Sequence, residues 1–380
     1  MTGGPAPTDA WRVDRLELRD VRSWHRVALD LPDGVTVLTG HNGAGKTSLV
    51  EALALAAVGA SPRTAQLADV VRHGAQAFHV RAVFRDPTSV LSSTEREIGY
   101  QQRLGRRLAQ DGAAVARLAA WRRPGSVLVF VPEELRAVKG PPAARRRGLD
   151  RVLEAVVPGF TQAQSDYAAA LAQRNALLRR AKTGGPAALE QAYVWETQMG
   201  LAGARIVAGR REGLRLLAQP YAHWLRALGG EDDGAVRREP SPRSLADTSD
   251  DAWAAEFAAY LEDRRARDAA AGMTLAGPHR DDLWMGWADL DARRLGSQGE
   301  QRTVALALLL AHKQMLTEAS ARPILLLDDV LSELDPDRRR ALLDAVATAG
   351  QTLITTADTR YRPTDDVPDA TRIRVPEDLA

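Results

Sequence analysis

Apolar and polar residues alternate over much of the first hundred positions, which is typical of strands with one buried face. Two strands are predicted where the apolar positions are Val13, Leu16, Leu18, Val27, Leu29 and Leu31. Residues 35–39 read Val-Thr-Val-Leu-Thr and predict a short buried strand that follows them. Further alternation over residues 78–84, and more weakly over 97–101, indicates an antiparallel meander beside this strand.

The pattern changes at Pro132. From there to about Ala271 apolar residues recur with the period of a helix, and helices are predicted over about 160–182, 187–228 and 249–271. Residues 229–249 are acidic, polar and rich in proline, so they predict a loop. No heptad pattern persists for the roughly three or four repeats that a coiled coil needs.

Strands and helices alternate again after residue 272. Continuous apolar runs predict buried strands at 127–131 and 324–327, another strand is predicted at 351–354, and a long helix is predicted over 300–318. The elements therefore predict an α/β protein in which one sheet-bearing domain is divided in the sequence. Its expected ranges are 11–131 and 272–380, with a helical arm domain of 132–271 inserted and a flexible tail of 1–10 in front.

The composition of the chain disfavours several classes of protein. A chain of 380 residues predicts two or three lobes, and 45% hydrophobic and 26% charged residues are ordinary values for a globular protein. No apolar run approaches the ~20 residues of a membrane span, and the first ten residues lack the basic and apolar regions of a signal peptide. The absence of cysteine excludes disulfides, thiol catalysis and cysteine-based zinc sites, and it fits a cytoplasmic location.

Residues 40–47 read Gly-His-Asn-Gly-Ala-Gly-Lys-Thr, which is the G-x-x-x-x-G-K-T pattern of a P-loop. A predicted strand precedes it and a predicted helix over 48–58 follows it, so the helix dipole adds to the anion site. We expect Lys46 to reach the β- and γ-phosphates of ATP as a catalytic cation, and the Thr47 hydroxyl to ligate Mg²⁺. The other expected nucleotide-binding residues are Gly40, His41, Asn42, Gly43, Ala44, Gly45 and Ser48. The alternative, a chance glycine turn, does not explain the flanking strand and helix.

Asp328 and Asp329 follow the apolar run of 324–327 directly. An acid at the carboxyl end of a buried strand lies at the edge where open α/β sheets bind ligands. We therefore predict that Asp328 holds Mg²⁺ opposite Thr47 and that Asp329 polarises the attacking water. An apolar run followed by an acid is weak on its own, and it gains weight from the P-loop in the same chain.

Ser297, Gln298 and Gly299 open the long predicted helix. A serine and a glycine at a helix N-terminus present a hydroxyl and free N–H groups, so this segment is a candidate second phosphate site. An ordinary serine N-cap is the alternative.

Basic residues cluster in the predicted arm. Phosphate contact is the natural use of such groups, and a solvated helix face offset by acids is the alternative. The candidate DNA contacts are Lys139, Arg145, Arg146, Arg147 and Arg174. The sequence offers no aromatic platform on which single-stranded bases would stack, so a duplex backbone is favoured. His279, Arg280, Asp281 and Asp282 could form a metal or catalytic cluster, but an ion-paired loop is the preferred interpretation.

Several blocks, in this order along the chain, resemble the bacterial RecF family, a branch of the ATP-binding-cassette ATPases of the chromosome-maintenance type. The resemblance extends from about Val13 to Asp358. Besides the P-loop, Ser297 to Gly299 and Asp328-Asp329, the blocks are residues 129–135, 139–147, 173–178, 195–198, 277–282, 296–303 and 332–335.

The resemblance implies an ATPase head in which a P-loop mixed sheet is flanked by helices and accompanied by an antiparallel β subdomain, with the helical arm inserted. It also implies that ATP joins two heads into a homodimer. Ser297, Gln298 and Gly299 of one chain would then face the γ-phosphate in the other, and Asp335 would lie in the D-loop at the dimer interface.

The resemblance further implies binding of double-stranded DNA and of junctions between single- and double-stranded DNA at gaps. With RecO and RecR such a protein helps to load RecA in gap repair and the SOS response. Its ATP hydrolysis would be slow, stimulated by DNA, and coupled to release of the dimer. ATP and Mg²⁺ are the implied cofactors, and no membrane partner is implied.

Three other classes of protein fit the sequence less well or remain as alternatives. A transporter's nucleotide-binding subunit is disfavoured because Lys46 and Ser297 are 251 positions apart and an arm lies between them. A coiled-coil chromosome-organising ATPase would need a longer, heptad-bearing insert. A scaffold that holds ATP without hydrolysing it is less remote, because Asp329 is one methylene shorter than a glutamate.

Overall fold

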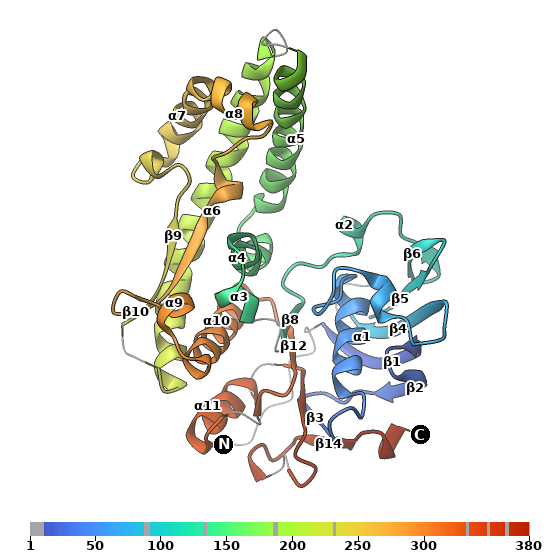
Figure 1. The fold of residues 1–380 in the computed structure, drawn as a ribbon. Helices are drawn as coiled ribbons and strands as arrows, with labels where there is room; N and C mark the ends of the chain where they lie inside the picture. The colour runs from blue at the N-terminus through green and yellow to red at the C-terminus, as the bar shows by residue number, and fades with distance from the viewer. Residues whose placement is uncertain are drawn as a thin grey trace. The chain divides into compact units, whose positions relative to one another are not determined.

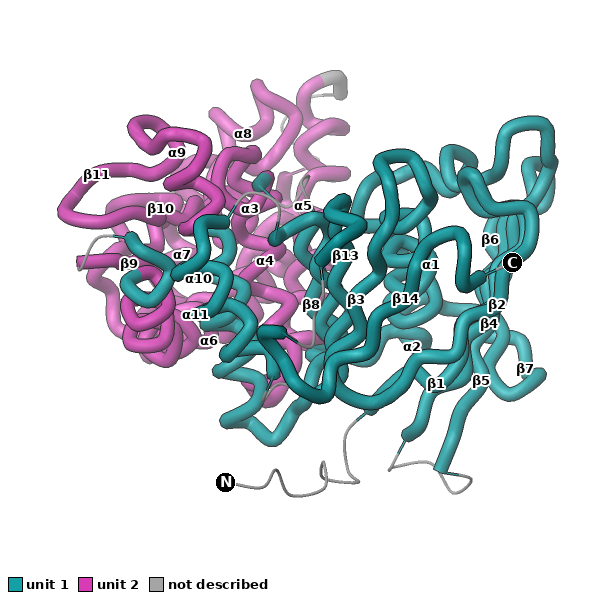
Figure 2. Tube along the Cα trace, turned by 90° about the horizontal axis from the view of Figure 1, so that it is seen from below, with its two compact units in different colours: residues 1–135, 226–230, 305–380 teal, residues 136–225, 231–304 magenta. Residues whose placement is uncertain are grey.

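The computed structural model of the protein describes residues 11–86, 92–131, 135–184, 189–230, 233–331, 334–347, 350–361 and 365–379. The predicted tail of residues 1–10 lies outside these ranges. The chain divides into two units, which Figure 2 distinguishes by colour. Unit 1 comprises residues 1–135, 226–230 and 305–380, and unit 2 comprises residues 136–225 and 231–304.

Unit 1 contains a parallel sheet, one strand of which leads into the predicted phosphate loop. Its five strands lie in the order β14-β3-β13-β12-β8, and every neighbouring pair is parallel. The strands are β3 (Val35–Thr39), β8 (Val127–Phe130), β12 (Ile324–Leu327), β13 (Thr352–Thr356) and β14 (Thr371–Arg374). Strands β3, β12 and β13 are buried throughout, as is usual for the strands of a parallel sheet.

A second sheet of unit 1 is antiparallel and has the order β2-β1-β4-β5-β6-β7. Its strands are β1 (Arg12–Val21), β2 (Trp24–Asp30), β4 (Ala77–Arg85), β5 (Ser93–Gln101), β6 (Gly105–Gln110) and β7 (Ala113–Ala114). Along β4 buried and half-buried residues alternate strictly, as the sequence predicted for one buried face. The sequence predicted a mixed sheet at the P-loop and a separate antiparallel subdomain. In the structure the sheet at the P-loop is parallel throughout, and the antiparallel strands of unit 1 form the other sheet.

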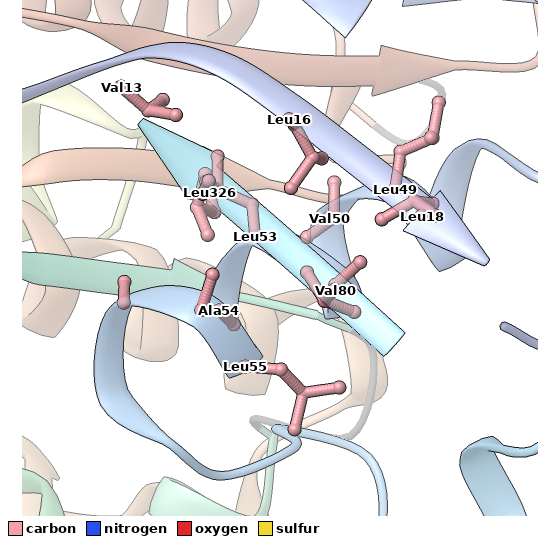
Figure 3. Close-up of a cluster of buried hydrophobic side chains, with 14 of the residues drawn as sticks. Val13, Leu16, Leu18, Leu49, Val50, Leu53, Ala54, Leu55, Val80 and Leu326 are labelled. Carbon is pink, nitrogen blue, oxygen red and sulfur yellow. The ribbon is translucent and has the colours of Figure 1, made fainter. Parts of the chain in front are cut away.

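Helix α1 (Lys46–Val58) packs against both sheets, contacting β1, β4 and β5 of one and β8, β12 and β13 of the other. Every residue from Ser48 to Ala57 is buried, Glu51 included, as expected for a helix that is covered on all sides. Figure 3 shows Leu49, Val50 and Leu53 of this helix in the core with Leu16 and Val80 of the antiparallel sheet.

The remaining helices of unit 1 are short apart from the long α10, whose residues belong to unit 2 up to Val304 and to unit 1 from Ala305. They are α2 (Leu118–Trp121), α10 (Gln298–Glu318) and α11 (Pro336–Ala347), with 3₁₀ turns at Leu67–Val70 and Glu377–Leu379. The helix predicted over 300–318 is therefore present, and it begins two residues earlier.

Unit 2 is mainly helical (Figure 1). Its helices are α3 (Arg136–Lys139), α4 (Pro142–Val156), α5 (Phe160–Gly184), α6 (Ala192–Ala227), α7 (Asp250–Asp263), α8 (Arg265–Ala271) and α9 (Ala292–Leu295). A small antiparallel sheet has the order β11-β10-β9, formed by β9 (Gly234–Glu239), β10 (Asp282–Trp287) and β11 (Leu290–Asp291). Two 3₁₀ turns, Arg243–Leu245 and Pro278–Arg280, complete the unit.

Two predictions at the carboxyl end of the arm differ from the structure. Residues 229–249 were expected to form a loop, but β9 lies within them because it pairs with β10 from Gly234 to Glu239. That pairing also places residues 272–304 in unit 2, whereas the sequence assigned them to the head. The signal was weak because β9 has few apolar residues and carries two adjacent arginines, Arg237 and Arg238.

Buried arginines join the helices of unit 2. Arg174 of α5 is fully buried, and it donates to Glu196 of α6 at 3.2 Å and to Asp268 of α8 at 2.6 Å. It also donates to the Thr274 hydroxyl at 2.8 Å and to the carbonyl of Leu261 at 2.9 Å. The Arg174 guanidinium therefore connects α5 to α6, α7 and α8 and to the turn that follows α8.

We expect Arg174→Met to lower the free energy of unfolding by about 3–5 kcal/mol, because the Asp268 carboxylate would remain buried without its cation. The measurement is the urea midpoint of the full chain, followed by circular dichroism. Arg151→Met is the matched control, since Arg151 is exposed in the same unit, and its midpoint should stay within experimental error. Equal midpoints for the two variants would contradict the structural role of Arg174.

Candidate nucleotide site

The loop of residues 40–47 connects β3 to α1, and its glycines are required by geometry. Gly43 and Gly45 have φ values of 85° and 96°, which strain any residue with a Cβ. A Cβ at Gly40 would come within 2.2 Å of the carbonyl oxygen of Val375. Trp24 fills the space where a Cβ of Gly45 would lie, and its indole Nε1 donates to the Gly45 carbonyl at 3.0 Å.

The Lys46 ammonium lies against its own loop. It donates to the carbonyl oxygens of Gly40 at 2.7 Å and His41 at 2.9 Å. Burial lowers the pKa of Lys46, while the charges of Asp329 and Asp328 oppose that shift. An anion in this loop would therefore compete with two carbonyl oxygens for the ammonium.

Asp328 is the meeting point of the loop and the parallel sheet. Its carboxylate accepts from the Thr47 hydroxyl, with oxygen–oxygen distances of 2.9 and 3.0 Å, and from the Thr355 hydroxyl at 2.7 Å. Burial raises the pKa of Asp328, and the two hydroxyl donors oppose that effect. A buried carboxylate next to a threonine hydroxyl is the oxygen donor set that Mg²⁺ prefers, so these two residues fit the metal that the sequence implied.

Asp329 follows in a left-handed backbone conformation, with φ 49°. Its N–H donates to the Thr355 hydroxyl at 2.9 Å, so Thr355 fixes both acids of the pair. Positive φ is uncommon outside glycine and is most frequent for Asn and Asp among the other residues. This turn directs the chain away from β12 directly after its buried end.

A cavity of about 370 Å³ lies at this edge of the parallel sheet, and its size is in the range of small-ligand sites. The predicted residues that line it are Asn42, Gly43, Gly45, Lys46, Thr47, Ser48, Asp328 and Asp329. Gly40, His41 and Ala44 belong to the same loop without lining the cavity. Four further lining residues, Arg22, Ser23, Arg63 and Thr355, were not assigned to the site from the sequence.

Glu51 of α1 orients the two arginines of the cavity. Its carboxylate is fully buried and accepts from Arg22 through Nε at 2.8 Å and Nη2 at 2.7 Å. It also accepts from the Ser61 hydroxyl at 2.5 Å and from Arg63 at 3.5 Å. A glutamate one turn into a P-loop helix, on a face that must be buried, was the signal in the sequence for this network.

The segment Ser297–Gly299 lies in unit 2 and is exposed. The Ser297 hydroxyl accepts from the N–H of Glu300 at 3.3 Å, and the Glu300 carboxylate accepts from the N–H of Ser297 at 2.6 Å. This reciprocal pair is a capping box, so the ordinary N-cap interpretation describes the segment in this chain. Gln298 and Gly299 are exposed beside it, and their contact with a nucleotide stays a prediction.

Asp335 caps α11 by accepting from the N–H of Arg338 at 3.0 Å, and its carboxylate lies 3.1 Å from Nε of Arg338. Ser332 and Glu333 of the predicted D-loop lie outside the described residues.

The candidate DNA contacts divide by burial. Arg174 is buried as described above, and Arg145 is 2% exposed, where it donates to Asp282 and to the Gly140 carbonyl. These two are corrected to structural residues, because a phosphate does not reach a guanidinium enclosed by carboxylates and carbonyls. Arg146 is half-buried and donates to the carbonyls of His279 and Asp281.

Lys139 and Arg147 are exposed, and neither has an ion-pair partner in the described part of the chain. DNA contact stays a prediction for these two residues.

The segment 277–282 is ion-paired, as preferred from the sequence. Asp281 is fully buried and accepts from Arg210 at 3.0 Å, from Arg238 at 2.7 Å and from the N–H of Ser241 at 2.8 Å. Within the described ranges, no group of three or more His, Asp or Glu side chains is arranged to hold a metal ion. Among the helices that the structure describes, none is long and apolar enough to cross a membrane.

Known proteins that resemble this chain in sequence and one that resembles it in structure belong to the same family. Residues 15–101 match the family described as AAA domain. A DNA replication and repair protein RecF from Heliobacterium modesticaldum is 37% identical, over 91% of this chain and 92% of that protein. The RecF of Acidothermus cellulolyticus is 39% identical, over 91% of this chain and 93% of that protein.

Solved structures agree with these relatives. A structure of the recombination mediator protein RecF with ATP in the RecFOR pathway has a TM-score of 0.82 and 25% identity, covering 93% of this chain and 94% of that one. The Smc head domain of Pyrococcus furiosus, with a TM-score of 0.56 and 14% identity over 97% of this chain and 95% of that one, shares the fold alone. The chain therefore belongs to the RecF family, and its fold is an ATP-binding-cassette ATPase head with an inserted helical arm.

Proposed function

We propose that this protein is an ATP-dependent DNA-binding recombination mediator with a weak ATPase activity that DNA stimulates. Membership of the RecF family carries a role in DNA repair and recombination. The observation that supports an ATPase most directly is the bond from Thr47 to Asp328, two residues 281 positions apart. That bond brings the phosphate loop and the acid pair to one cavity.

In the proposed site the Thr47 hydroxyl and the Asp328 carboxylate hold Mg²⁺. When bound, Mg²⁺ supplies positive charge to the β- and γ-phosphate oxygens. Lys46 exchanges the carbonyls of Gly40 and His41 for the same phosphates. Arg22 and Arg63, held by Glu51, add positive charge at the wall of the cavity.

Asp329 is the proposed general base. It accepts a proton from a water molecule as the water oxygen bonds to the γ-phosphorus and the bond to the β–γ bridging oxygen breaks. The products are ADP and inorganic phosphate. Because only one acid lines the cavity besides the proposed metal ligand, the described residues offer no competing base there.

ATP also acts as an adhesive between two chains in this proposal. Ser297, Gln298 and Gly299 of one chain face the γ-phosphate bound to the other, with Asp335 at the interface. The resulting homodimer binds double-stranded DNA and junctions at gaps, partly through Lys139 and Arg147. With RecO and RecR it promotes loading of RecA in gap repair and the SOS response in the cytoplasm, and hydrolysis releases the dimer.

A scaffold that holds ATP without hydrolysing it is the second candidate. The observation in its favour is the Asp329 carboxylate, which is shorter than a glutamate and is attached to a backbone at positive φ. Phosphate release with and without duplex DNA separates the two candidates, because a scaffold releases none under either condition.

We expect Asp329→Asn to reduce phosphate release by about 10²-fold or more while ATP binding is retained, since the amide does not accept the proton of the water. Phosphate release is measured at saturating ATP, and binding is measured with a fluorescent ATP analogue. Lys46→Arg is the comparison variant, which should lose turnover through the phosphate loop. Turnover near the wild-type rate in Asp329→Asn would remove Asp329 from catalysis.

We expect Glu51→Gln to weaken ATP binding about tenfold, because a neutral amide holds Arg22 and Arg63 less firmly than a carboxylate does. Equilibrium titration with the fluorescent analogue measures the change, and a thermal melt shows whether the variant is folded. Glu17→Gln is the matched control, since Glu17 is ion-paired on the antiparallel sheet of the same unit. A folded Glu51→Gln variant with unchanged affinity would contradict the positioning role.

We expect Ser297→Arg to abolish ATP-driven dimerisation while each chain still binds ATP, because Ser297 serves the site of the partner. Sedimentation with a non-hydrolysable analogue, with and without duplex DNA, measures the dimer fraction. Ser244→Arg, at another exposed serine of unit 2, should dimerise normally. Wild-type chains that stay monomeric with the analogue, and whose DNA affinity is unchanged by it, would refute the ATP-gated clamp.

A further inference from the structure

Unit 2 contains a cavity of about 620 Å³ that the proposed ATPase cycle does not use. Helix α5 contributes Asn175, Arg179 and Lys182 to its wall. The turn that follows α8, with Met273 and Thr274, and the 3₁₀ turn with His279 and Arg280 line the rest of it together with the end of α8. The volume is in the range of sites that enclose a ligand or a side chain of a partner.

The floor of this cavity is held in place by partly buried hydrogen bonds. The Asn175 amide oxygen accepts from the N–H of Thr274 at 2.7 Å and from its hydroxyl at 2.8 Å. His279 Nδ1 lies 2.8 Å from the Tyr167 hydroxyl, and its Nε2 lies 3.4 Å from the Thr274 carbonyl. Burial lowers the pKa of His279 to about 4, so the ring is neutral at pH 7 and the floor carries no charge.

The mouth of the cavity is basic. Arg179, Lys182 and Arg280 are exposed and line it, and no acidic side chain lines it within the described residues. Lys182 and Arg179 lie above Gly272, where a Cβ would come within 3.5 and 3.7 Å of their side chains. Three cations around an uncharged floor favour an anionic ligand.

Apolar surface adjoins these cations. Met273 is 43% exposed and lines the cavity, and Leu275, two residues further along, is 39% exposed. The Arg280 guanidinium lies 3.3 Å from the sulfur of Met273, so a charged group and an apolar group are in contact at the edge of the cavity. Exposed large apolar side chains next to a cavity mark interaction sites more often than isolated ones do.

Two sequence blocks that the nucleotide chemistry leaves unexplained meet here. Residues 173–178 supply Arg174 and Asn175, and residues 277–282 supply His279 and Arg280. Arg174 and Asn175 of the first block bond to the Thr274 hydroxyl, and His279 of the second lies 3.4 Å from the Thr274 carbonyl, so one buried threonine contacts both blocks. The blocks therefore build this cavity as well as the core of unit 2.

We propose that this cavity is a docking site for an acidic protein segment that inserts an apolar side chain. Carboxylates of the segment pair with Lys182 and Arg280, and its apolar side chain contacts Met273 above the neutral floor. A duplex backbone fits less well, because it is convex and would reach only the cations at the mouth. Among the residues that the structure describes, no Trp, Tyr or Phe lines the cavity to stack on a single-stranded base.

The test uses the full chain and a fluorescein-labelled peptide in which acidic residues flank one leucine and one phenylalanine. We expect the double variant Lys182→Glu with Arg280→Glu to weaken peptide binding about tenfold or more in fluorescence anisotropy. The matched control reverses two other exposed arginines of unit 2, Arg151→Glu with Arg205→Glu, and should bind as the wild type does. Equal loss in both double variants would overturn the site, since it would reflect net charge alone.

Two further measurements test whether an apolar side chain inserts into the cavity and whether the ligand is a peptide or duplex DNA. Met273→Ser should weaken the peptide about threefold or more, while a peptide with serines at the two apolar positions should bind Met273→Ser and the wild type equally. If apolar and serine-substituted peptides bind the wild type equally, insertion is refuted. If Lys182→Glu with Arg280→Glu loses duplex DNA affinity and keeps the peptide, the cavity is a nucleic-acid site and the proposal is wrong.

The nucleotide site is tested separately in the same samples. The cavity variants should release phosphate at the wild-type rate in the absence of DNA, because none of the changed residues lines the nucleotide cavity or belongs to the segment Ser297–Gly299. Peptide binding measured without ATP is independent of the proposed ATPase, so failure of either proposal leaves the other intact.

Discussion

The burial of α1 between two sheets is the constraint on which the nucleotide site depends. The helix is predominantly apolar, and every residue from Ser48 to Ala57 lies in the core of unit 1. The phosphate loop enters this helix at Lys46, and its position is therefore fixed by core packing and by a few tight glycines. The same burial encloses Glu51, whose charge must be paired because an isolated buried carboxylate is strongly unfavourable. Arg22 and Arg63 satisfy that requirement, and in doing so their side chains come to line the cavity.

Unit 2 is held together by a different interaction. Buried guanidinium groups bond to carboxylates from other elements: Arg174 to Glu196 and Asp268, and Arg210 to Asp150 and Asp281. Desolvation offsets much of the Coulomb attraction in such pairs, so their main consequence is that the loss of one partner is strongly destabilising. They also demand fixed geometry, since each guanidinium donates to several acceptors at once. The floor of the proposed docking cavity is rigid for the same reason, because Thr274 in that floor bonds to the buried Arg174.

The outcome for the arginines shows the limit of sequence patterns. Arg145, Arg146 and Arg147 were all candidate DNA contacts, although three consecutive residues of a helix face different ways and do not all reach one DNA backbone. On α4 they point in different directions, so Arg145 is enclosed by Asp282 and Gly140 while Arg147 remains exposed. The acidic partner of Arg145 lies far away in the chain, because 137 positions separate Arg145 from Asp282. No local pattern contains that information, and the same reason explains why β9 was missed, since its pairing with β10 is also distant.

The sequence by itself determined the phosphate loop, the acid pair after β12, the strands with one buried face and the helical character of the arm, because glycine requirements and hydrophobic periods are local properties. It also determined the RecF family, through blocks spread along the whole chain. Only the tertiary structure decided that Arg22, Arg63 and Thr355 share the cavity with Lys46 and Asp328, and which arginines are internal. Those facts depend on which surfaces α1 and the buried carboxylates bring together, and contacts of that kind join residues that the sequence keeps apart.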